Sequence, residues 1–156
     1  MLAVIEEGSL GAGMRRFVHA AFLAALWLTV LAATDRAEAG VKVRIDRAGQ
    51  TMAVIVDGIR RYTWPVSTGR RSYGTPAGVF HPQMLAARWF SRRYYNSPMP
   101  HAIFFHGGFA IHGSYEIARL GGPASHGRVR LHPHDAAILF GLVVREGMRN
   151  TTIVVR

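Results

Sequence analysis

Two stretches, ASHGRVRL at residues 124–131 and IHGS at residues 111–114, carry most of the information in this chain of 156 residues. Each places a histidine directly before a glycine, and Arg128 stands 16 residues after His112. A histidine can donate or accept a proton near neutral pH, and a glycine permits tight turns. We therefore expect a catalytic or binding site to be built from these two stretches.

Three upstream segments supply further landmarks. They are VSTG at residues 66–69, TPAGVF at residues 75–80 and PMP at residues 98–100. In sequence and in order, the five segments closely resemble the L,D-transpeptidase catalytic domain of the YkuD type. The resemblance extends from Val66 to Leu131. It implies a mainly β fold, an L,D-transpeptidase β-sandwich with one late α-helix.

The resemblance also implies a reaction, acyl transfer between peptidoglycan stem peptides in cell-wall biosynthesis and remodelling. In the family a cysteine thiolate attacks the third-position diamino acid, expels the terminal D-alanine and passes the acyl group to an amine. By resemblance, His112 is the proton donor and acceptor, His126 belongs to the catalytic motif, and the turn of Gly127 and Arg128 supplies N–H donors to the oxyanion. The substrate-binding residues that it implies are Gly113, Ser125 and Arg130. No cofactor and no metal ion are implied.

Arg128 is the point at which this sequence departs from the family, because the resemblance places the catalytic cysteine there. The chain has no cysteine, which excludes thiolate chemistry and disulfides. A guanidinium stays protonated and has no usable lone pair, so it can bind a carboxylate but cannot attack a carbonyl. The hydroxyls of Ser114 and Ser125 lie nearby in sequence, but we expect the Ser125 hydroxyl to point into its own loop. Transpeptidation is therefore expected to be impaired.

Three explanations of Arg128 stay open. The domain could be a non-catalytic peptidoglycan-binding module, in which the guanidinium pairs with stem-peptide carboxylates. Alternatively, a single-base change could have produced Arg128, since the cysteine codons TGT and TGC become CGT and CGC by one transition. The gene product could also be disabled and under no constraint. The sequence does not rank the first two.

Residues 1–39 are predicted to be an N-terminal extension plus a cleaved signal peptide, with the L,D-transpeptidase-like domain at residues 40–156. Arg15 and Arg16 precede an apolar run at residues 17–33, and Ala37 to Ala39 form a small-x-small cleavage site. The alternative to cleavage is that this segment is retained as a membrane anchor, which would be the chain's only contact with a membrane. The alternative start of the chain is Met14 in place of Met1. We expect export to the periplasm or cell envelope.

The charge of the chain points to anionic partners. Three of its 19 basic and four of its 9 acidic residues lie within residues 1–39, which leaves 16 basic and five acidic residues in the domain. Such a balance favours polyanionic surroundings. For an exported domain these are anionic envelope polymers beside the stem peptides, and no nucleic-acid-binding motif accompanies the charge.

Periodicity predicts the secondary structure. Alternating or continuous apolar residues predict strands at residues 41–45, 52–56, 59–66, 102–105, 109–111 and 151–155. Asp57 and Gly58 predict a hairpin turn, and Pro65 an edge strand or strand end. A helix is predicted at residues 133–146, because Pro133 suits a first helical turn and the apolar residues after it recur at helical spacing. Gly147 is expected to end that helix.

Two further groups have a structural and a functional interpretation. Four histidines could suggest a metal site with His112 and His126, but no carboxylates accompany them, so a structural role is favoured: His101, His106, His132 and His134. An arginine-rich aromatic segment could line a substrate groove or form a half-buried strand: Trp89, Phe90, Tyr94 and Tyr95. Arg130 is interpreted either as holding the loop or a substrate carboxylate, or as a solvated strand charge.

Overall fold

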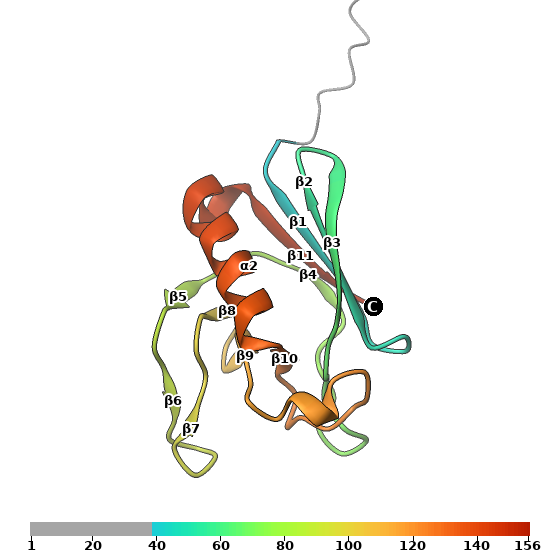
Figure 1. The fold of residues 1–156 in the computed structure, drawn as a ribbon, viewed down its shortest axis with the longest axis vertical. Coiled ribbons are helices and arrows are strands. Elements are labelled where there is room, and N and C mark those ends of the chain that lie inside the picture. The colour runs from blue at the N-terminus through green and yellow to red at the C-terminus, as the bar shows by residue number, and fades with distance from the viewer. Residues whose placement is uncertain (1–38) are drawn as a thin grey trace, which may run out of the picture. The chain divides into compact units, whose positions relative to one another are not determined.

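The computed structural model describes residues 39–156, which form a mainly β domain (Figure 1). The predicted N-terminal extension and signal peptide lie outside the described residues except for Ala39, as does the choice between Met1 and Met14. Within residues 39–156 there is one α-helix, late in the chain, beside eleven strands and two short 3-10 helices. The predicted fold class is confirmed.

The larger sheet has five strands. In chain order they are β1 (Val41–Asp46), β2 (Thr51–Val56), β3 (Ile59–Pro65), β4 (Gly78–Phe80) and β11 (Thr151–Val155). Their order across the sheet is β3-β2-β1-β11-β4, so the early strand β1 and the late strand β11 are neighbours, and they run parallel. Alternate residues of β1, namely Val41, Val43 and Ile45, are buried as their spacing predicts.

The predicted hairpin turn joins β2 to β3. Asp57 has φ 50° and Gly58 has φ 77°, the left-handed conformation that two-residue turns between twisted strands require at both positions. β3 lies at the edge of the sheet and ends at Pro65. An edge strand and the end of a strand both tolerate proline, which has no backbone N–H. The predictions for this hairpin are therefore confirmed.

The second sheet has four strands. These are β5 (Met84–Ala86), β8 (Ala102–His106), β9 (Phe109–Gly113) and β10 (Val129–Leu131), in the order β10-β9-β8-β5. β6 (Phe90–Ser91) and β7 (Ser97–Pro98) form a separate hairpin. The apolar runs at residues 102–105 and 109–111 correctly predict β8 and β9. The sequence pattern does not predict β4, β5, β6, β7 or β10, because two or three residues are too few to show a period.

The helix α2 (Pro133–Glu146) has the predicted bounds. Pro133 occupies its first turn, and the His132 side chain accepts a hydrogen bond from the His134 N–H. Gly147 follows the helix with φ 88°, a backbone conformation that glycine adopts without strain. The helix buries one face, formed by Ala136, Leu139, Leu142 and Val143. His132 therefore caps a helix, and among residues 39–156 no group of three potential ligand side chains could hold a metal ion.

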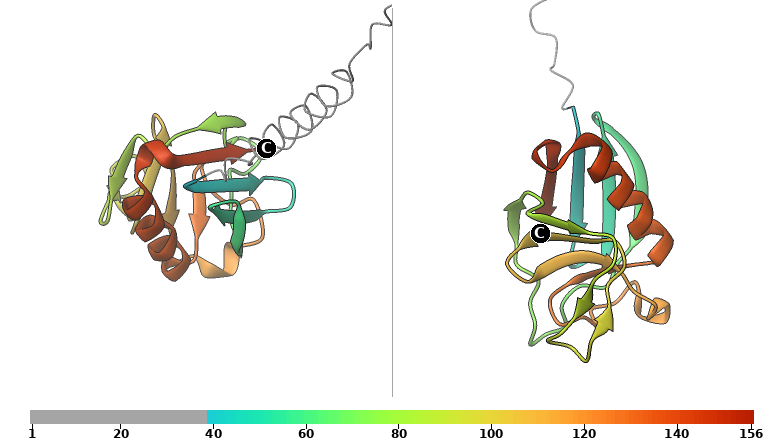
Figure 2. Two further views of the ribbon diagram at one scale, coloured as in Figure 1. Left: turned by 90° about the horizontal axis from the view of Figure 1, so that it is seen from above. Right: turned by 90° about the vertical axis from the view of Figure 1, so that its left-hand side faces the viewer.

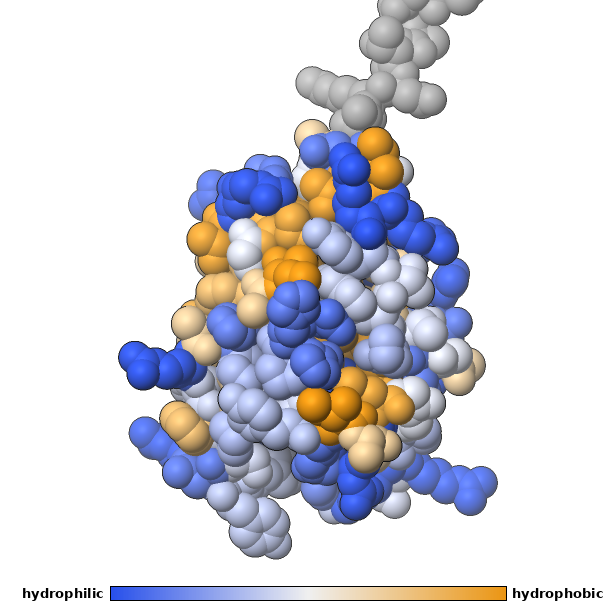
Figure 3. All heavy atoms as spheres, in the orientation of Figure 1, coloured by the Kyte–Doolittle hydropathy of each residue, from blue (hydrophilic) through white to orange (hydrophobic). Residues whose placement is uncertain are grey.

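One main core joins both sheets and α2. Figure 2 shows the helix alongside the strands of both sheets, and the core cluster includes Val54 of β2, Ile111 of β9 and Leu139 of α2. On the surface, exposed apolar side chains form separate patches among hydrophilic ones on the face shown in Figure 3. In the described part of the chain, no helix is both long enough and apolar enough to cross a membrane.

The second sheet brings the two informative stretches together. β9 and β10 are parallel neighbours, with Arg130 opposite His112. Isolated bridges then tie Ser67 to Arg130 and Gly69 to Ser125. A small 3-10 helix, η1 (Ile117–Arg119), lies in the loop between β9 and β10, and a second, η2 (Met148–Asn150), precedes β11. The bridges made by Ser67 and Gly69 thus attach the loop before β4 to β10 and to the loop that precedes it.

Candidate active site

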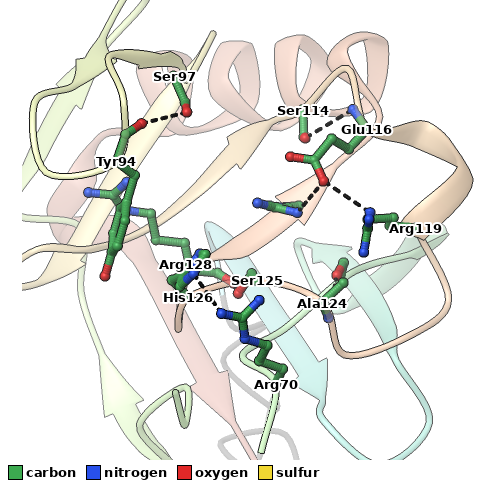
Figure 4. A network of polar contacts seen from close by, with 12 residues as sticks. Arg70, Tyr94, Ser97, Ser114, Glu116, Arg119, Ala124, Ser125, His126 and Arg128 are labelled. Carbon is green, nitrogen blue, oxygen red and sulfur yellow. Dashed lines mark hydrogen bonds and ion pairs between the residues drawn. The ribbon is translucent and has the colours of Figure 1, made fainter. Parts of the chain in front are cut away.

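A cavity of about 270 Å³ lies where these segments meet. Its walls come from the β6–β7 hairpin, the end of β9 with the loop that follows it, and the loop that leads into β10. The site residues predicted from the sequence that line it are His112, Ser125, His126, Arg128 and Arg130. Figure 4 shows polar contacts beside this cavity, among them that of Arg70 with His126 and that of Glu116 with Arg119.

His112 is buried in this cavity with its imidazole in a defined tautomer. Nδ1 lies 2.6 Å from the Gly113 carbonyl oxygen, which can only accept, so Nδ1 carries the proton and Nε2 keeps its lone pair. Burial lowers the pKa of His112 to about 4, and the positive charges of Arg128 and Arg130 act in the same direction. The ring is therefore neutral at pH 7 and able to accept a proton at Nε2.

The loop before β10 is held by the Ser125 hydroxyl. Ser125 Oγ accepts a hydrogen bond from the Gly127 N–H at 3.0 Å and donates one to the Arg128 carbonyl at 2.5 Å. Thr75 Oγ1 donates to the Gly127 carbonyl at 2.8 Å. Gly127 has φ 100°, and a Cβ there would lie 2.8 Å from the Phe109 ring, so the turn requires glycine. As expected, the Ser125 hydroxyl points into its loop.

This hydrogen bond changes the expected set of oxyanion donors. The Gly127 N–H is occupied by Ser125 Oγ, so of the two N–H groups predicted for this turn, that of Arg128 remains. Gly113 has a structural position, because its N–H donates to the Pro100 carbonyl and a Cβ would lie 3.0 Å from Pro100 and Pro133 atoms. Neither glycine lines the cavity.

His126 lies in a layer of aromatic and cationic groups. Its Nε2 is 2.9 Å from a guanidinium nitrogen of Arg70, which can only donate, so Nε2 accepts and Nδ1 bears the proton. The ring stacks on Tyr94 at 4.7 Å and meets Tyr73 edge-on at 4.6 Å. Desolvation and then the charge of Arg70 lower the pKa of His126. This histidine is therefore a neutral wall of the site.

Arg128 is half-buried and fixed by three contacts. Its Nη1 donates to Ser91 Oγ at 2.9 Å, its Nε donates to the Gly108 carbonyl at 3.2 Å, and its guanidinium carbon lies 5.2 Å from the centre of the Tyr94 ring. Partial burial lowers the pKa of Arg128, as do the nearby charges of Arg93 and Arg130. A guanidinium nevertheless remains a cation in proteins. The loop before β10, the β6–β7 hairpin and the β8–β9 turn thus meet at one positive charge.

Arg130 is paired and is not a solvated strand charge. Its Nη1 lies 3.1 Å from Glu116 Oε2, which also lies 3.3 Å from Nε of Arg119, and 15% of the Arg130 side chain is exposed. The backbone N–H of Glu116 donates to Ser114 Oγ. The interpretation of Arg130 as a group that holds the loop agrees with these contacts. Figure 4 labels Ser114, Glu116 and Arg119 of this group.

The profile of the YkuD L,D-transpeptidase catalytic domain matches residues 40–155 of this chain. The chain belongs to the L,D-transpeptidase catalytic domain family. The match to this profile confirms the family assignment that the five sequence landmarks predict. Among curated protein sequences, none matches the chain.

Solved structures of L,D-transpeptidases are similar in fold. The chain resembles an L,D-transpeptidase from Mycobacterium smegmatis with 23% identity and a TM-score of 0.68, over 76% of this chain and 59% of that one. It resembles residues 123–326 of the L,D-transpeptidase from Xylanimonas cellulosilytica with 28% identity and a TM-score of 0.65, over 79% and 63%. It also resembles L,D-transpeptidase 3 from Mycobacterium tuberculosis in complex with a faropenem-derived adduct, with 18% identity and a TM-score of 0.67, over 75% and 60%. The chain thus spans less than two thirds of each.

Sequence reasoning missed several residues of this L,D-transpeptidase domain that complete the site. Glu116 binds Arg130, and Arg70 and Ser91 hold His126 and Arg128. For Glu116 a signal existed, since it is the only acidic residue between Asp57 and Asp135. Of the arginine-rich aromatic segment, Tyr94 lines the cavity. Arg70 and Ser91 lie 56 and 37 residues from their partners, and nothing local identifies them.

We predict that the free energy of unfolding falls as the pH falls from about 6.5 to about 4. The His112 pKa is lower in the folded state, so the unfolded chain takes up more protons in this window and is favoured. A shift of this size corresponds to about 3 kcal/mol. Urea unfolding at several pH values measures the effect, and histidine NMR measures the folded-state pKa. In His112→Gln the slope should become much shallower, and an unchanged slope there would contradict the assignment.

Proposed function

We propose that this domain binds peptidoglycan stem peptides as an L,D-transpeptidase whose acyl transfer is impaired by Arg128 at the nucleophile position. The observation that carries the proposal is that a buried, neutral His112 and the guanidinium of Arg128 line the same cavity. His112 has the lone pair that a general base needs. The chain offers it no thiol, because it has no cysteine.

With a cysteine at position 128 the proposed reaction would be complete. His112 Nε2 would take the thiol proton, and the thiolate would attack the carbonyl carbon of the diamino acid to form a tetrahedral oxyanion. Collapse of that intermediate would expel D-alanine as its amine, which receives the proton from His112. An acceptor amine would then attack the thioester carbonyl and give a proton to His112 Nε2, and the C–S bond would break to release the thiolate, which takes that proton back from His112. The backbone N–H of residue 128 is the donor available to the oxyanion.

A serine is a poor replacement for that thiol. Ser125 Oγ already donates to the Arg128 carbonyl and accepts from the Gly127 N–H. Using this hydroxyl as a nucleophile would require breaking the hydrogen bonds that hold the loop. Ser114 Oγ accepts from the Glu116 N–H, and its hydroxyl lies beside the Arg130–Glu116 pair. These contacts support an impaired enzyme over a serine-dependent one.

We predict that the unsubstituted protein does not catalyse transpeptidation and that the Arg128→Cys variant does. Purified protein of both forms is incubated with tetrapeptide muropeptides, and mass spectrometry measures D-alanine release and cross-linked products. The variant should form cross-links at least about a hundredfold faster, because activation of a nucleophile by a positioned base contributes roughly that much or more.

The matched controls separate the possible causes. Arg128→Ala tests whether removal of the guanidinium alone suffices, because alanine adds no nucleophile, and the double variant Arg128→Cys with His112→Gln should lose the gained activity. Activity of the unsubstituted protein would contradict the proposed impairment. The Ser125→Ala variant would then test whether the Ser125 hydroxyl is the nucleophile. Inactivity of both forms would contradict an intact catalytic scaffold.

The alternative function is a non-catalytic peptidoglycan-binding module on the same fold. The fixed guanidinium of Arg128 favours it, because a positioned cation can pair with a stem-peptide carboxylate. We predict that binding to isolated sacculi falls by less than about threefold when salt rises from 0.1 to 1 M, since specific contacts survive screening. Co-sedimentation measures this retention. Loss of nearly all binding would instead indicate diffuse attraction to anionic envelope polymers.

We further propose that the domain works after export, in the periplasm or cell envelope. This rests on the signal-peptide pattern within residues 1–39 and on the excess of basic residues in the domain. The expected mature chain begins near Gly40. Cell fractionation followed by N-terminal sequencing tests the proposal, and recovery of an uncleaved chain from the cytoplasm would contradict it.

A further inference from the structure

A second cavity, of about 230 Å³, adjoins the first at Arg128. It shares Tyr94, His126 and Arg128 with the cavity that contains His112. We call these three side chains the partition and the second cavity the outer chamber. Because the partition borders both spaces, Arg128 presents its charge to a chamber that His112 does not line.

Ring stacking and hydrogen bonds hold the partition together. Tyr94 stacks on His126, and the Arg128 guanidinium lies 5.2 Å from the centre of the Tyr94 ring. Hydrogen bonds to Ser91 and Gly108 fix two of the five N–H donors of Arg128. A guanidinium fixed in this way loses little side-chain entropy when it binds an anion.

The outer chamber is positively charged and partly aromatic. Arg93 and Arg128 both line it, and Tyr73 and Phe109 supply apolar surface. Within residues 39–156, neither arginine has a carboxylate within 4.0 Å, whereas Glu116 is held by Arg119 and Arg130 in the His112 cavity. Two like charges beside one cavity repel each other unless an anion lies between them.

We propose that the outer chamber binds a carboxylate group carried on a small, partly apolar body. The carboxylate lies between Arg93 and Arg128, and the rings of Tyr73, Tyr94 and Phe109 contact the body. A bidentate guanidinium contact suits the planar carboxylate. The inference deepens the binding alternative above, since it names the chamber and the group that Arg128 recognises, but it does not depend on transpeptidation.

NMR titration of the ¹⁵N-labelled protein tests the proposal. The probe is N-acetyl-D-alanine at pH 7 and constant ionic strength, and N-acetyl-D-alaninamide is its uncharged counterpart. We expect the acid to shift the backbone amides of Gly74, Gly108 and Phe109 and to bind at least about tenfold more tightly than the amide, as for charge-assisted hydrogen bonds. Equal binding of acid and amide, no shift at the highest soluble concentration, or shifts confined to Ser114 and Tyr115 would overturn it.

Two arginine variants provide a matched comparison. Arg93→Gln removes one charge from the chamber and should weaken binding of the acid by roughly fivefold, since Arg93 is exposed and partly screened. Arg61→Gln removes the same charge from the exposed face of β3 and should change binding by less than about twofold. Equal losses in both variants would overturn the proposal in favour of general charge attraction. Because the readout is a chemical shift, failure of Arg128→Cys to catalyse cross-linking leaves this result interpretable.

Discussion

The parallel pairing of β9 with β10 is the contact on which the cavity depends, because it sets Arg130 opposite His112. The pairing is reinforced on both sides. Ser67 exchanges two backbone hydrogen bonds with Arg130, and the Ser114 N–H donates to the Leu131 carbonyl. A parallel pair needs a long connection, and here that connection carries η1, Glu116 and the Ser125 loop. The site is thus the crossover between two strands, and shifting their register by one residue would point His112 away from it.

Electrostatic balance in this region rests on one acid. Glu116 lies between Arg119 and Arg130, while Arg70 and Arg128 are held by neutral partners, an imidazole and a hydroxyl. The surplus positive charge adds to burial in keeping His112 unprotonated. The same surplus of positive charge thus helps burial to keep His112 neutral and also attracts anions to this surface.

The sequence predicted the parts of the fold that depend on local pattern. Alternation in β1, the Asp57–Gly58 turn and the apolar stripe of α2 each act within a few residues, and the structure agrees with them. Family landmarks located His112, Ser125, His126, Arg128 and Arg130, which the fold brings to one cavity. The hairpin of β6 and β7 has no periodic signal, and the contact of Arg128 with Ser91 exists only once that hairpin has folded over the loop. Contacts of this kind depend on tertiary distance, which periodicity does not encode.

The position of β11 between β1 and β4 has a consequence for the order of assembly. The five-stranded sheet stays split until residues 151–155 are available, since β11 lies between β1 and β4 in the strand order. Val43 and Ile153, which are opposite each other and fully buried, are 110 positions apart. Bringing such distant segments together makes folding slow. A chain synthesised from its N-terminus therefore cannot complete this sheet until residues 151–155 have been made.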